Sequence, residues 1–257
     1  MSAPNPREYA NRERAESFGS RADEYDQFRP SYPAALIDEL LALGPRDALD
    51  VGCGTGKAAL PLVRRGVQVL GVEVDPRMAA VARQHGLAVE VAAFESWPDN
   101  DRRFDLLLSG QAWHWVDPVR GAAKAAAVLR PAGHLALFWN VGDFAPSVRE
   151  RMHAVYREVA PSVLGLLGAG APIAHTVDRY REPLRVAGLE QQRTASYDWQ
   201  QVYTRAEWLA LLSTHSDHST LPVDVLTQVR NRVGELIDEL GGSLTIEYST
   251  QLLLASR

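Results

Sequence analysis

Leu49-Asp50-Val51-Gly52-Cys53-Gly54-Thr55-Gly56-Lys57 is the stretch that decides the fold of this 257-residue chain. In it a short apolar run leads into three alternate glycines, and a helical stretch follows. Glycine has no Cβ, so such a turn can adopt backbone angles that other residues avoid, and a ligand can approach the backbone closely. A strand, a glycine turn and a helix in this order indicate a nucleotide-binding α/β unit.

Apolar runs alternate with helical stretches on both sides of this turn, as far as residue 140. The runs are continuously apolar, as expected of strands that are covered on both faces of a sheet. We therefore predict an α/β, Rossmann-like fold with a seven-stranded, mainly parallel sheet, helices on both faces and a helical cap. The first five strands are expected at 48–51, 67–74, 87–92, 104–109 and 135–139, and the helices between them at 56–65, 76–85 and 119–129.

The pattern changes after Asn140. Further strands are expected at 189–199 and 245–255, and helices at 204–213 and 223–240. This division predicts three parts: residues 1–140 as an N-terminal lid plus the ligand-binding core, 141–188 as a helical cap, and 189–257 as completion of the core sheet, with a second cap segment at 204–240. Open α/β sheets bind ligands at the carboxyl ends of their strands, which the cap would cover.

The composition fits a globular protein of ordinary type. Hydrophobic residues make up 46% and charged residues 23%, which argues against disorder. Asp and Glu outnumber Lys and Arg by 32 to 27, so the net charge of −5 lacks the footprint of a general nucleic-acid binder. The single cysteine, Cys53, cannot form an internal disulfide. With no apolar signal segment at the polar N-terminus, we expect a cytoplasmic protein with no membrane association.

The glycine turn and an acidic residue downstream of it limit the class of ligand that can bind here. Glu73 ends the next predicted strand, where a carboxylate can accept hydrogen bonds from a ribose diol. A dinucleotide motif G-x-G-x-x-G requires glycine at position 57, which is Lys57, and this argues against a nicotinamide-linked oxidoreductase. The Gly-Lys-[Ser/Thr] of a P-loop is also absent. Asp50 would sit poorly beside a pyrophosphate but suits a ligand that carries an ammonium group.

Several segments together resemble one enzyme superfamily. Asp50-Val51-Gly52-Cys53-Gly54-Thr55-Gly56 resembles motif I of class I S-adenosylmethionine-dependent methyltransferases, and Val69-Leu70-Gly71-Val72-Glu73-Val74-Asp75-Pro76 is similar to their second motif. Leu129-Arg130-Pro131-Ala132-Gly133 resembles the turn before their fifth strand, with Ala132 in place of a glycine. Within the superfamily, Arg29-Pro30-Ser31-Tyr32-Pro33 and Gln111-Ala112-Trp113-His114-Trp115-Val116-Asp117 resemble the methyltransferase type 11 group, which includes trans-aconitate methyltransferase-like enzymes.

This resemblance implies a binding site for S-adenosyl-L-methionine, with S-adenosyl-L-homocysteine as its product. The glycine turn would lie against the methionine end, Asp50 would accept from the α-amino group, and Glu73 would bind both ribose hydroxyls. Where relatives have an aspartate that recognises adenine, this chain has Ala93. The cofactor-binding residues that the resemblance predicts are Tyr25, Arg29, Tyr32, Asp50, Gly52, Cys53, Gly54, Gly56, Glu73, Val74, Phe94, Glu95, Ser109, Gly110 and Gln111.

These residues have separate expected roles. Val74 would pack on the adenine face, and Phe94 and Glu95 would contact the adenine, although Phe94 can equally be a core residue. The lid segment with Arg29 would cover the cofactor and meet its carboxylate. Ser109, Gly110 and Gln111 would lie beside the methionine and the acceptor.

The methyl acceptor is expected to be a small molecule whose reacting atom (O, N, C or S) stays open. If a proton must be removed, His114 is the first candidate base and His215 the second. His215 and His218 have metal-ligand spacing, but no third ligand is evident, so no metal is predicted. A carboxylate acceptor would instead need cationic groups, for which Arg149, Arg151, Arg179 and Arg181 are candidates.

Two alternatives to a methyltransferase that acts on a small molecule remain open, and the sequence does not decide the assembly state. One alternative is an RNA or protein methyltransferase, and the other is a non-catalytic protein of the same fold that binds the cofactor. A monomer or a homodimer is expected.

Overall fold

The sheet of the computed structural model has seven strands in the order β3-β2-β1-β4-β5-β7-β6. The structure describes residues 19, 21–166, 173–190, 192–215, 218 and 221–257. The five strands from β3 to β5 pair in parallel, and β7 runs antiparallel to both β5 and β6. The strands are β1 (Asp47–Val51), β2 (Gln68–Glu73), β3 (Ala88–Val91), β4 (Phe104–Gly110), β5 (Leu129–Asp143), β6 (Arg193–Thr204) and β7 (Ser243–Ser256).

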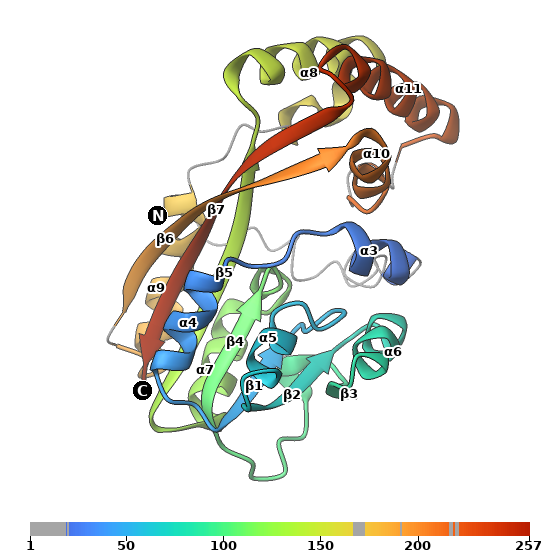
Figure 1. The fold of residues 1–257 in the computed structure, drawn as a ribbon. Helices are drawn as coiled ribbons and strands as arrows, with labels where there is room; N and C mark the ends of the chain where they lie inside the picture. Colours follow the sequence, from blue (N-terminus) through green and yellow to red (C-terminus); the bar gives the residue numbers. More distant parts are fainter. Residues whose placement is uncertain (1–18, 20, 167–172, 191, 216–217, 219–220) are drawn as a thin grey trace.

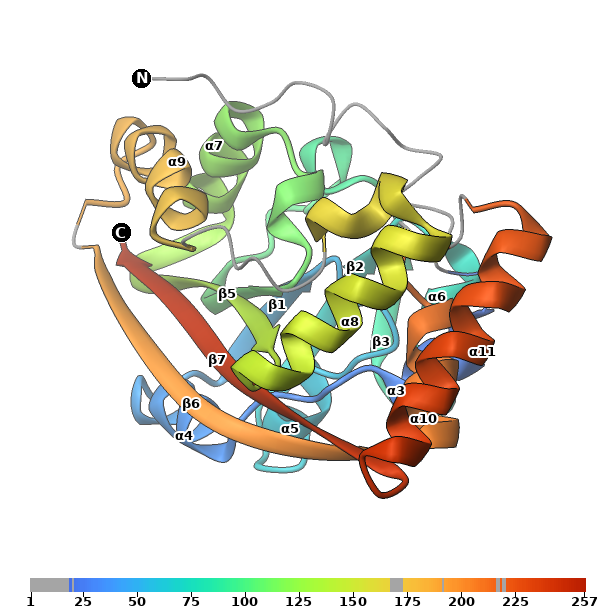
Figure 2. The same ribbon diagram turned by 90° about the horizontal axis from the view of Figure 1, so that it is seen from above.

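Helices cover both faces of this sheet, as Figure 2 shows, with α4 and α5 on one side and α7 and α9 on the other. The helices are α3 (Ala22–Phe28), α4 (Ala34–Ala42), α5 (Ala59–Val63), α6 (Pro76–Gln84), α7 (Pro118–Val128), α8 (Pro146–Val159), α9 (Ile173–Val186), α10 (Arg205–Ser213) and α11 (Val223–Glu239). Short 3-10 helices are η2 (Phe94–Ser96), η3 (Trp113–Trp115) and η4 (Pro161–Leu166). This arrangement confirms the predicted fold class.

Local sequence sets where two of the core helices begin. Asp75-Pro76 and Asp117-Pro118 each place an aspartate at the N-cap and a proline in the first turn. The Asp75 carboxylate accepts a hydrogen bond from the Arg77 amide, and that of Asp117 accepts from two amides of α7. Such caps satisfy amides that have no partner within the helix, and proline is already restricted to a helical φ. Both helices therefore start just after the segments that carry the site.

Strands β5 and β7 extend well past the parallel part of the sheet (Figure 1). The pairing of β4 with β5 ends at Phe138, whereas β5 continues to pair with β7 as far as Asp143. Around this extension, α8, α10 and α11 pack on the ends of the late strands in a hydrophobic cluster of their own. Helix α9 belongs instead to the core cluster that contains α7. The result is a helical layer at the carboxyl ends of the parallel strands.

The prediction of a strand at 135–139 was too short, since β5 begins at Leu129 and includes the segment expected as a turn. Within it, Ala132 has a φ of +61°, a backbone conformation that favours glycine.

Among the described residues, no helix combines the length and the apolar character that a membrane crossing needs.

Replacing Ala132 by glycine should stabilise the protein. The substitution removes a strained φ worth about 1–2 kcal/mol, offset in part by the extra freedom of glycine in the unfolded chain, so we expect a net gain of about 0.5–1 kcal/mol. The measurement is the free energy of urea unfolding. Ala123→Gly, at an exposed position inside α7, is the matched control and should cost about 1 kcal/mol. A loss of stability in Ala132→Gly would contradict the strain.

Candidate active site

A cavity of about 550 Å³ lies at the carboxyl ends of β1, β2 and β4. Its wall combines the glycine turn, the ends of these strands and the segments of η2 and η3. Tyr25 and Arg29 line it from the N-terminal segment, and His215 lines it from the end of α10. This is the position at which open α/β sheets bind their ligands.

The glycine turn has the backbone that its sequence predicts. Gly52, Gly54 and Gly56 have φ values of +67°, +55° and +92°. A Cβ on Gly52 would lie 2.4 Å from the Cβ of Ala112, so this position also requires glycine for the close approach of the segment after β4. Gly52 and Gly54 line the large cavity, and Gly56 does not. The turn thus presents bare backbone to the cavity.

Glu73, at the end of β2, is held by backbone amides. Its Oε2 accepts from the Gly54 amide at 2.9 Å, and its Oε1 accepts from the amides of Val74 and Asp75 at 2.8 and 3.0 Å. Among the described residues it forms no ion pair, although it faces the cavity and is only 7% exposed. Burial raises its pKa, and the three amide hydrogen bonds oppose that rise.

Asp50 lies in β1 directly before the turn and is fully buried, so it does not line the cavity. Neither of its carboxylate oxygens has a hydrogen-bond partner in the described part of the chain. Burial, together with the nearby charge of Glu73, raises the pKa of Asp50 to about 8, and the amide of Ala59 acts weakly in the opposite direction. Two neighbouring carboxylates without a cation favour a ligand that brings positive charge and hydrogen-bond donors.

The residues after β2 and β3 form one wall of the cavity. Val74, Phe94 and Glu95 all line it. Phe94 is also a core residue, 3% exposed, with its ring centroid 5.9 Å from that of Trp113. The Glu95 carboxylate accepts from the amide of Asp117 at 2.8 Å, which joins the segment after β3 to the start of α7.

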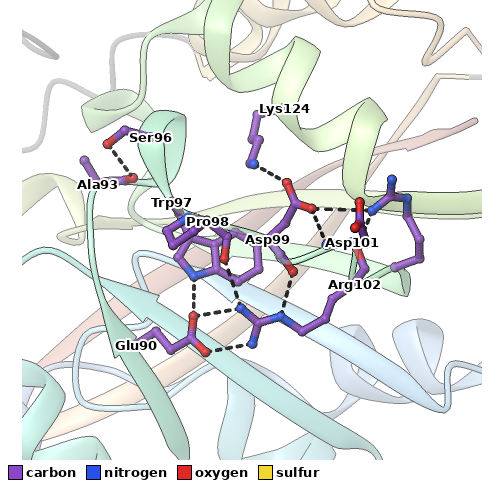
Figure 3. Close-up of polar contacts among 10 residues, drawn as sticks. Glu90, Ala93, Ser96, Trp97, Pro98, Asp99, Asp101, Arg102 and Lys124 are labelled. Carbon is purple, nitrogen blue, oxygen red and sulfur yellow. Dashed lines mark hydrogen bonds and ion pairs between the residues drawn. The ribbon is translucent and has the colours of Figure 1, made fainter.

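A polar cluster below this wall fixes it in place (Figure 3). The Glu90 carboxylate accepts from the indole N–H of Trp97 at 2.6 Å and from both terminal nitrogens of Arg102 at 2.7 and 2.9 Å. The guanidinium of Arg102 lies 4.8 Å from the centroid of the Trp97 ring. Lys124 of α7 pairs with Asp99 at 2.5 Å. The chain that leaves η2 is thereby tied to both β3 and α7.

The N-terminal segment covers the opposite side of the glycine turn. The ring of Tyr32 packs edge-on against Phe138 at 4.7 Å, and it lines a smaller cavity of about 50 Å³ together with Cys53. Arg29 lies over the ring of Tyr25 at 5.2 Å, and its guanidinium donates to the hydroxyl and the carbonyl of Thr214 at 2.9 and 2.8 Å. Arg29 therefore links this segment to the end of α10.

The end of β4 brings three predicted residues to different positions. Ser109 is buried and donates to the Val51 carbonyl at 2.8 Å, so it is structural here. A Cβ on Gly110 would lie 2.4 Å from the hydroxyl of Tyr32, which requires glycine. Gln111 lines the cavity with a φ of +58°, held by hydrogen bonds from its backbone amide to Phe138 and from its side chain to Asn140. Such strain at a non-glycine residue is common at functional sites.

A second cavity of about 220 Å³ adjoins the first. Arg29, Gln111 and His215 line both. Most of the other lining residues come from the extension of β5, the start of β7, η4 and α10, which the sequence analysis did not assign to a site. Those used below are Asp143, Phe144, Val163, Trp208, Leu211, Leu212, Ile246 and Tyr248.

The two candidate bases differ in position. His114, in η3, lines only the large cavity, whereas His215 lines both. Burial and the neighbouring Arg29 and His218 lower the pKa of His215 well below its usual value, so its imidazole is neutral at physiological pH. The ring of His218 lies 5.8 Å from that of His215, and its Nε2 is 2.7 Å from the hydroxyl of Tyr156. Position therefore favours His215 as the base nearer to a second ligand.

Comparison with known proteins agrees with this geometry. Residues 49–137 match the family described as a methyltransferase domain. An uncharacterized methyltransferase of Mycobacterium tuberculosis is 36% identical over 231 residues, which cover 89% of this chain and 88% of that protein. The chain therefore belongs to this family of methyltransferases.

Solved structures share the fold at lower identity. A type II methyltransferase structure from Anaeromyxobacter dehalogenans has a TM-score of 0.65 at 22% identity, covering 89% of this chain and 98% of that one. The phosphoethanolamine N-methyltransferase 2 of Haemonchus contortus, solved with S-adenosyl-L-methionine, has a TM-score of 0.51 at 16% identity, covering 93% of this chain and 57% of that one.

Replacing Asp50 by asparagine should change how stability depends on pH. A carboxyl with a raised pKa in the folded state contributes stability below its unfolded pKa of 3.8, and this is lost as pH rises toward about 8. Relative to the wild type, Asp50→Asn should therefore gain free energy of unfolding as pH rises, by up to about 1.4 kcal/mol per pH unit. Urea unfolding between pH 5 and pH 8 measures this (roughly the window that the linkage defines).

Asp224→Asn, at an exposed position in the first turn of α11, is the control and should show no such dependence. A difference between Asp50→Asn and wild type that stays constant with pH would mean that Asp50 is ionised in the folded protein without cost.

Proposed function

We propose that this protein is an S-adenosylmethionine-dependent methyltransferase that transfers the methyl group to a small molecule. The observation that carries the proposal is the pair of carboxyl groups, Asp50 and Glu73, which border the glycine turn and have no compensating cation among the described residues. A ligand with an ammonium group, a sulfonium and a ribose diol supplies the charge and the donors that these carboxylates lack. The family match supports the same assignment.

The residues present fit this cofactor. Glu73 faces the cavity and would accept hydrogen bonds from the ribose, with Val74 and Phe94 beside the adenine. Asp50 lies behind the turn and would attract the α-amino group from there, while Arg29 would meet the carboxylate. When bound, the cofactor supplies an activated methyl group on a sulfonium. The chain's own task is to orient the acceptor and exclude water.

The acceptor belongs in the second cavity, which shares Arg29, Gln111 and His215 with the first. In this arrangement His215 lies where the two ligands would meet. The lid and the segment after β4 favour a relationship to trans-aconitate methyltransferase-like enzymes. The buried free thiol of Cys53 is consistent with a cytoplasmic enzyme.

Calorimetric titration with S-adenosyl-L-homocysteine tests the cofactor assignment, and Gly54→Val is the informative variant. We expect one-to-one binding by the wild type and none by Gly54→Val, since the added side chain points into the cavity. Gly66→Val is a matched control, because Gly66 also has a positive φ (+90°) but no neighbour within 4 Å and no place in the cavity. Tighter binding of a nicotinamide dinucleotide would overturn the proposal.

Removing the Glu73 carboxylate should weaken the affinity for the same ligand by roughly 10-fold or more, because hydrogen bonds to a charged group are worth about 1.5–3 kcal/mol. Glu73→Ala removes the whole side chain, whereas Glu73→Gln keeps its shape and one acceptor oxygen but not the charge, so the two variants separate loss of the charge from loss of the side chain. Glu150→Ala, at an exposed position of α8, should leave the affinity unchanged. A loss below about 2-fold in both Glu73 variants would refute the ribose role.

A further inference from the structure

The second cavity has the lining of a site for a flat apolar ring. Phe144, Trp208 and Tyr248 line it with aromatic rings, and those of Phe144 and Trp208 meet at 5.6 Å with an interplanar angle of 70°. Branched apolar side chains complete the wall, namely Val163, Leu211, Leu212 and Ile246. Aromatic and branched apolar walls of this kind bind small ring compounds.

The size of the cavity limits the ligand. Its volume of about 220 Å³ is smaller than the roughly 300–1,000 Å³ typical of sites for drug-sized molecules. One ring with small substituents fits this volume, whereas a peptide or a nucleic-acid strand does not.

The charges around the cavity favour an uncharged ligand. Of the described lining residues, Arg29 and Asp143 carry formal charges, and Asp143 is paired with the guanidinium of Arg149, whose Nε lies 2.9 Å from Oδ1. Arg29 also lines the large cavity, where in the proposed function it would pair with the carboxylate of the cofactor. With Arg29 and Asp143 both compensated in this way, the second cavity has no net charge to offer an acceptor.

The cations expected for a carboxylate acceptor are used elsewhere. Arg149 pairs with Asp143, Arg151 with Glu239, and Arg181 with Asp178. Arg179, the fourth candidate, donates to the hydroxyl of Tyr180, and none of the four arginines lines the second cavity. An ammonium acceptor is also disfavoured, because Asp143, the carboxylate that lines the cavity, is already paired with Arg149.

Polar groups in the wall fit a hydroxyl. The indole N–H of Trp208, a residue 6% exposed, has no hydrogen-bond partner in the described part of the chain. Buried donors of this kind are normally satisfied. His215, neutral and shared by both cavities, can accept a proton where the cofactor and the acceptor meet.

We propose, building on the function proposed above, that the second cavity binds a small, uncharged phenol-type compound and that its hydroxyl is methylated with His215 as the proton acceptor. In this step the hydroxyl oxygen forms a bond to the methyl carbon as the carbon–sulfur bond breaks. The electron pair of that bond stays on sulfur, which becomes a neutral thioether. The hydroxyl proton passes to His215 and then to solvent.

The groups that face His215 come from several parts of the chain. Arg29 acts from the segment after α3, and His218, bonded to Tyr156 of α8, acts from the chain after α10. Asp143 of β5 and Tyr248 of β7 line the same cavity. Without cofactor, Arg29 disfavours a protonated His215 and so opposes the proton transfer, and a cofactor carboxylate paired with Arg29 would lessen that effect.

The test compares single-ring phenols with the benzoates and benzylamines that carry the same ring substituents. Two quantities are measured: binding in the presence of saturating S-adenosyl-L-homocysteine, by calorimetry, and transfer of labelled methyl from S-adenosyl-L-methionine. We expect the phenols to bind, and at least one to be methylated roughly 10-fold faster than its matched benzoate and benzylamine.

Variants locate the site. Leu212→Trp and Val163→Phe fill the second cavity and should weaken phenol binding by roughly 10-fold or more, while the affinity for S-adenosyl-L-homocysteine, which also reports folding, stays within about 2-fold. Ala206→Trp, on the exposed side of α10, is the matched control.

His215→Ala should lower kcat by roughly 100-fold or more, with partial rescue by added imidazole. The control His134→Ala, in β5, should leave kcat unchanged.

The outcomes separate the two proposals. If S-adenosyl-L-homocysteine binds but no phenol does, or if a benzoate or benzylamine is preferred, the acceptor class is wrong and the methyltransferase assignment stands. If S-adenosyl-L-homocysteine does not bind at all, both fail. Unchanged phenol binding in both cavity-filling variants would overturn the location.

Discussion

The hydrogen bond from the Gly54 amide to the Glu73 carboxylate joins the turn after β1 to the end of β2, and the wall of the large cavity depends on it. Only a chain without a Cβ at this turn can bring its amides to that carboxylate and still leave room for a ligand. The same carboxylate also accepts from the amides of Val74 and Asp75, which fixes the start of α6. One buried carboxylate thus organises the turn, the helix start and the cavity wall, and Asp50, whose pKa is raised to about 8, adds a second carboxyl group behind the turn.

The extension of β5 and β7 past the parallel sheet explains the second cavity. Because β5 has a partner on one side only beyond Phe138, its end is free to carry Asp143 and Phe144 above the large cavity. Helices α8, α10 and α11 pack around this two-stranded arm and enclose the space. The core sheet therefore provides most of the wall of the large cavity, and the arm with its helices provides most of the wall of the second cavity. Arg29, bonded to Thr214, connects the two walls.

The parallel strands and the glycine turn that form the wall of the large cavity could be predicted from the sequence, because their signals are local. Continuous apolar runs gave the parallel strands, and the alternate glycines at 52, 54 and 56 all adopt the positive φ that their spacing implies. The burial of Asp50 could not be predicted from the sequence, since a residue at the end of a strand can face either the cavity or the sheet. The sequence placed His114 before His215, whereas the structure places only His215 in the lining of both cavities, because their access to the cavities depends on how α10 packs.

The second cavity could not be predicted from the sequence, for a different reason. Its lining comes from segments near 143, 163, 211 and 247, which are far apart in the chain and carry no shared motif. The length of β5 was underestimated because Pro131, Gly133 and Gly142 weaken a strand pattern, whereas pairing with β7 extends the strand as far as Asp143 and pairing of Leu129 with β4 extends its start. Pairing between strands that are distant in sequence is a tertiary effect, and local propensity does not reveal it.

The most direct test of the central claim is a crystal structure of the protein with S-adenosyl-L-homocysteine. The account predicts density for the ribose within hydrogen-bond distance of Glu73, with the methionine end over the turn at Gly52 and Gly54 and the sulfur facing the second cavity. Density for this compound anywhere else on the protein, or a ribose that makes no contact with Glu73, would contradict it.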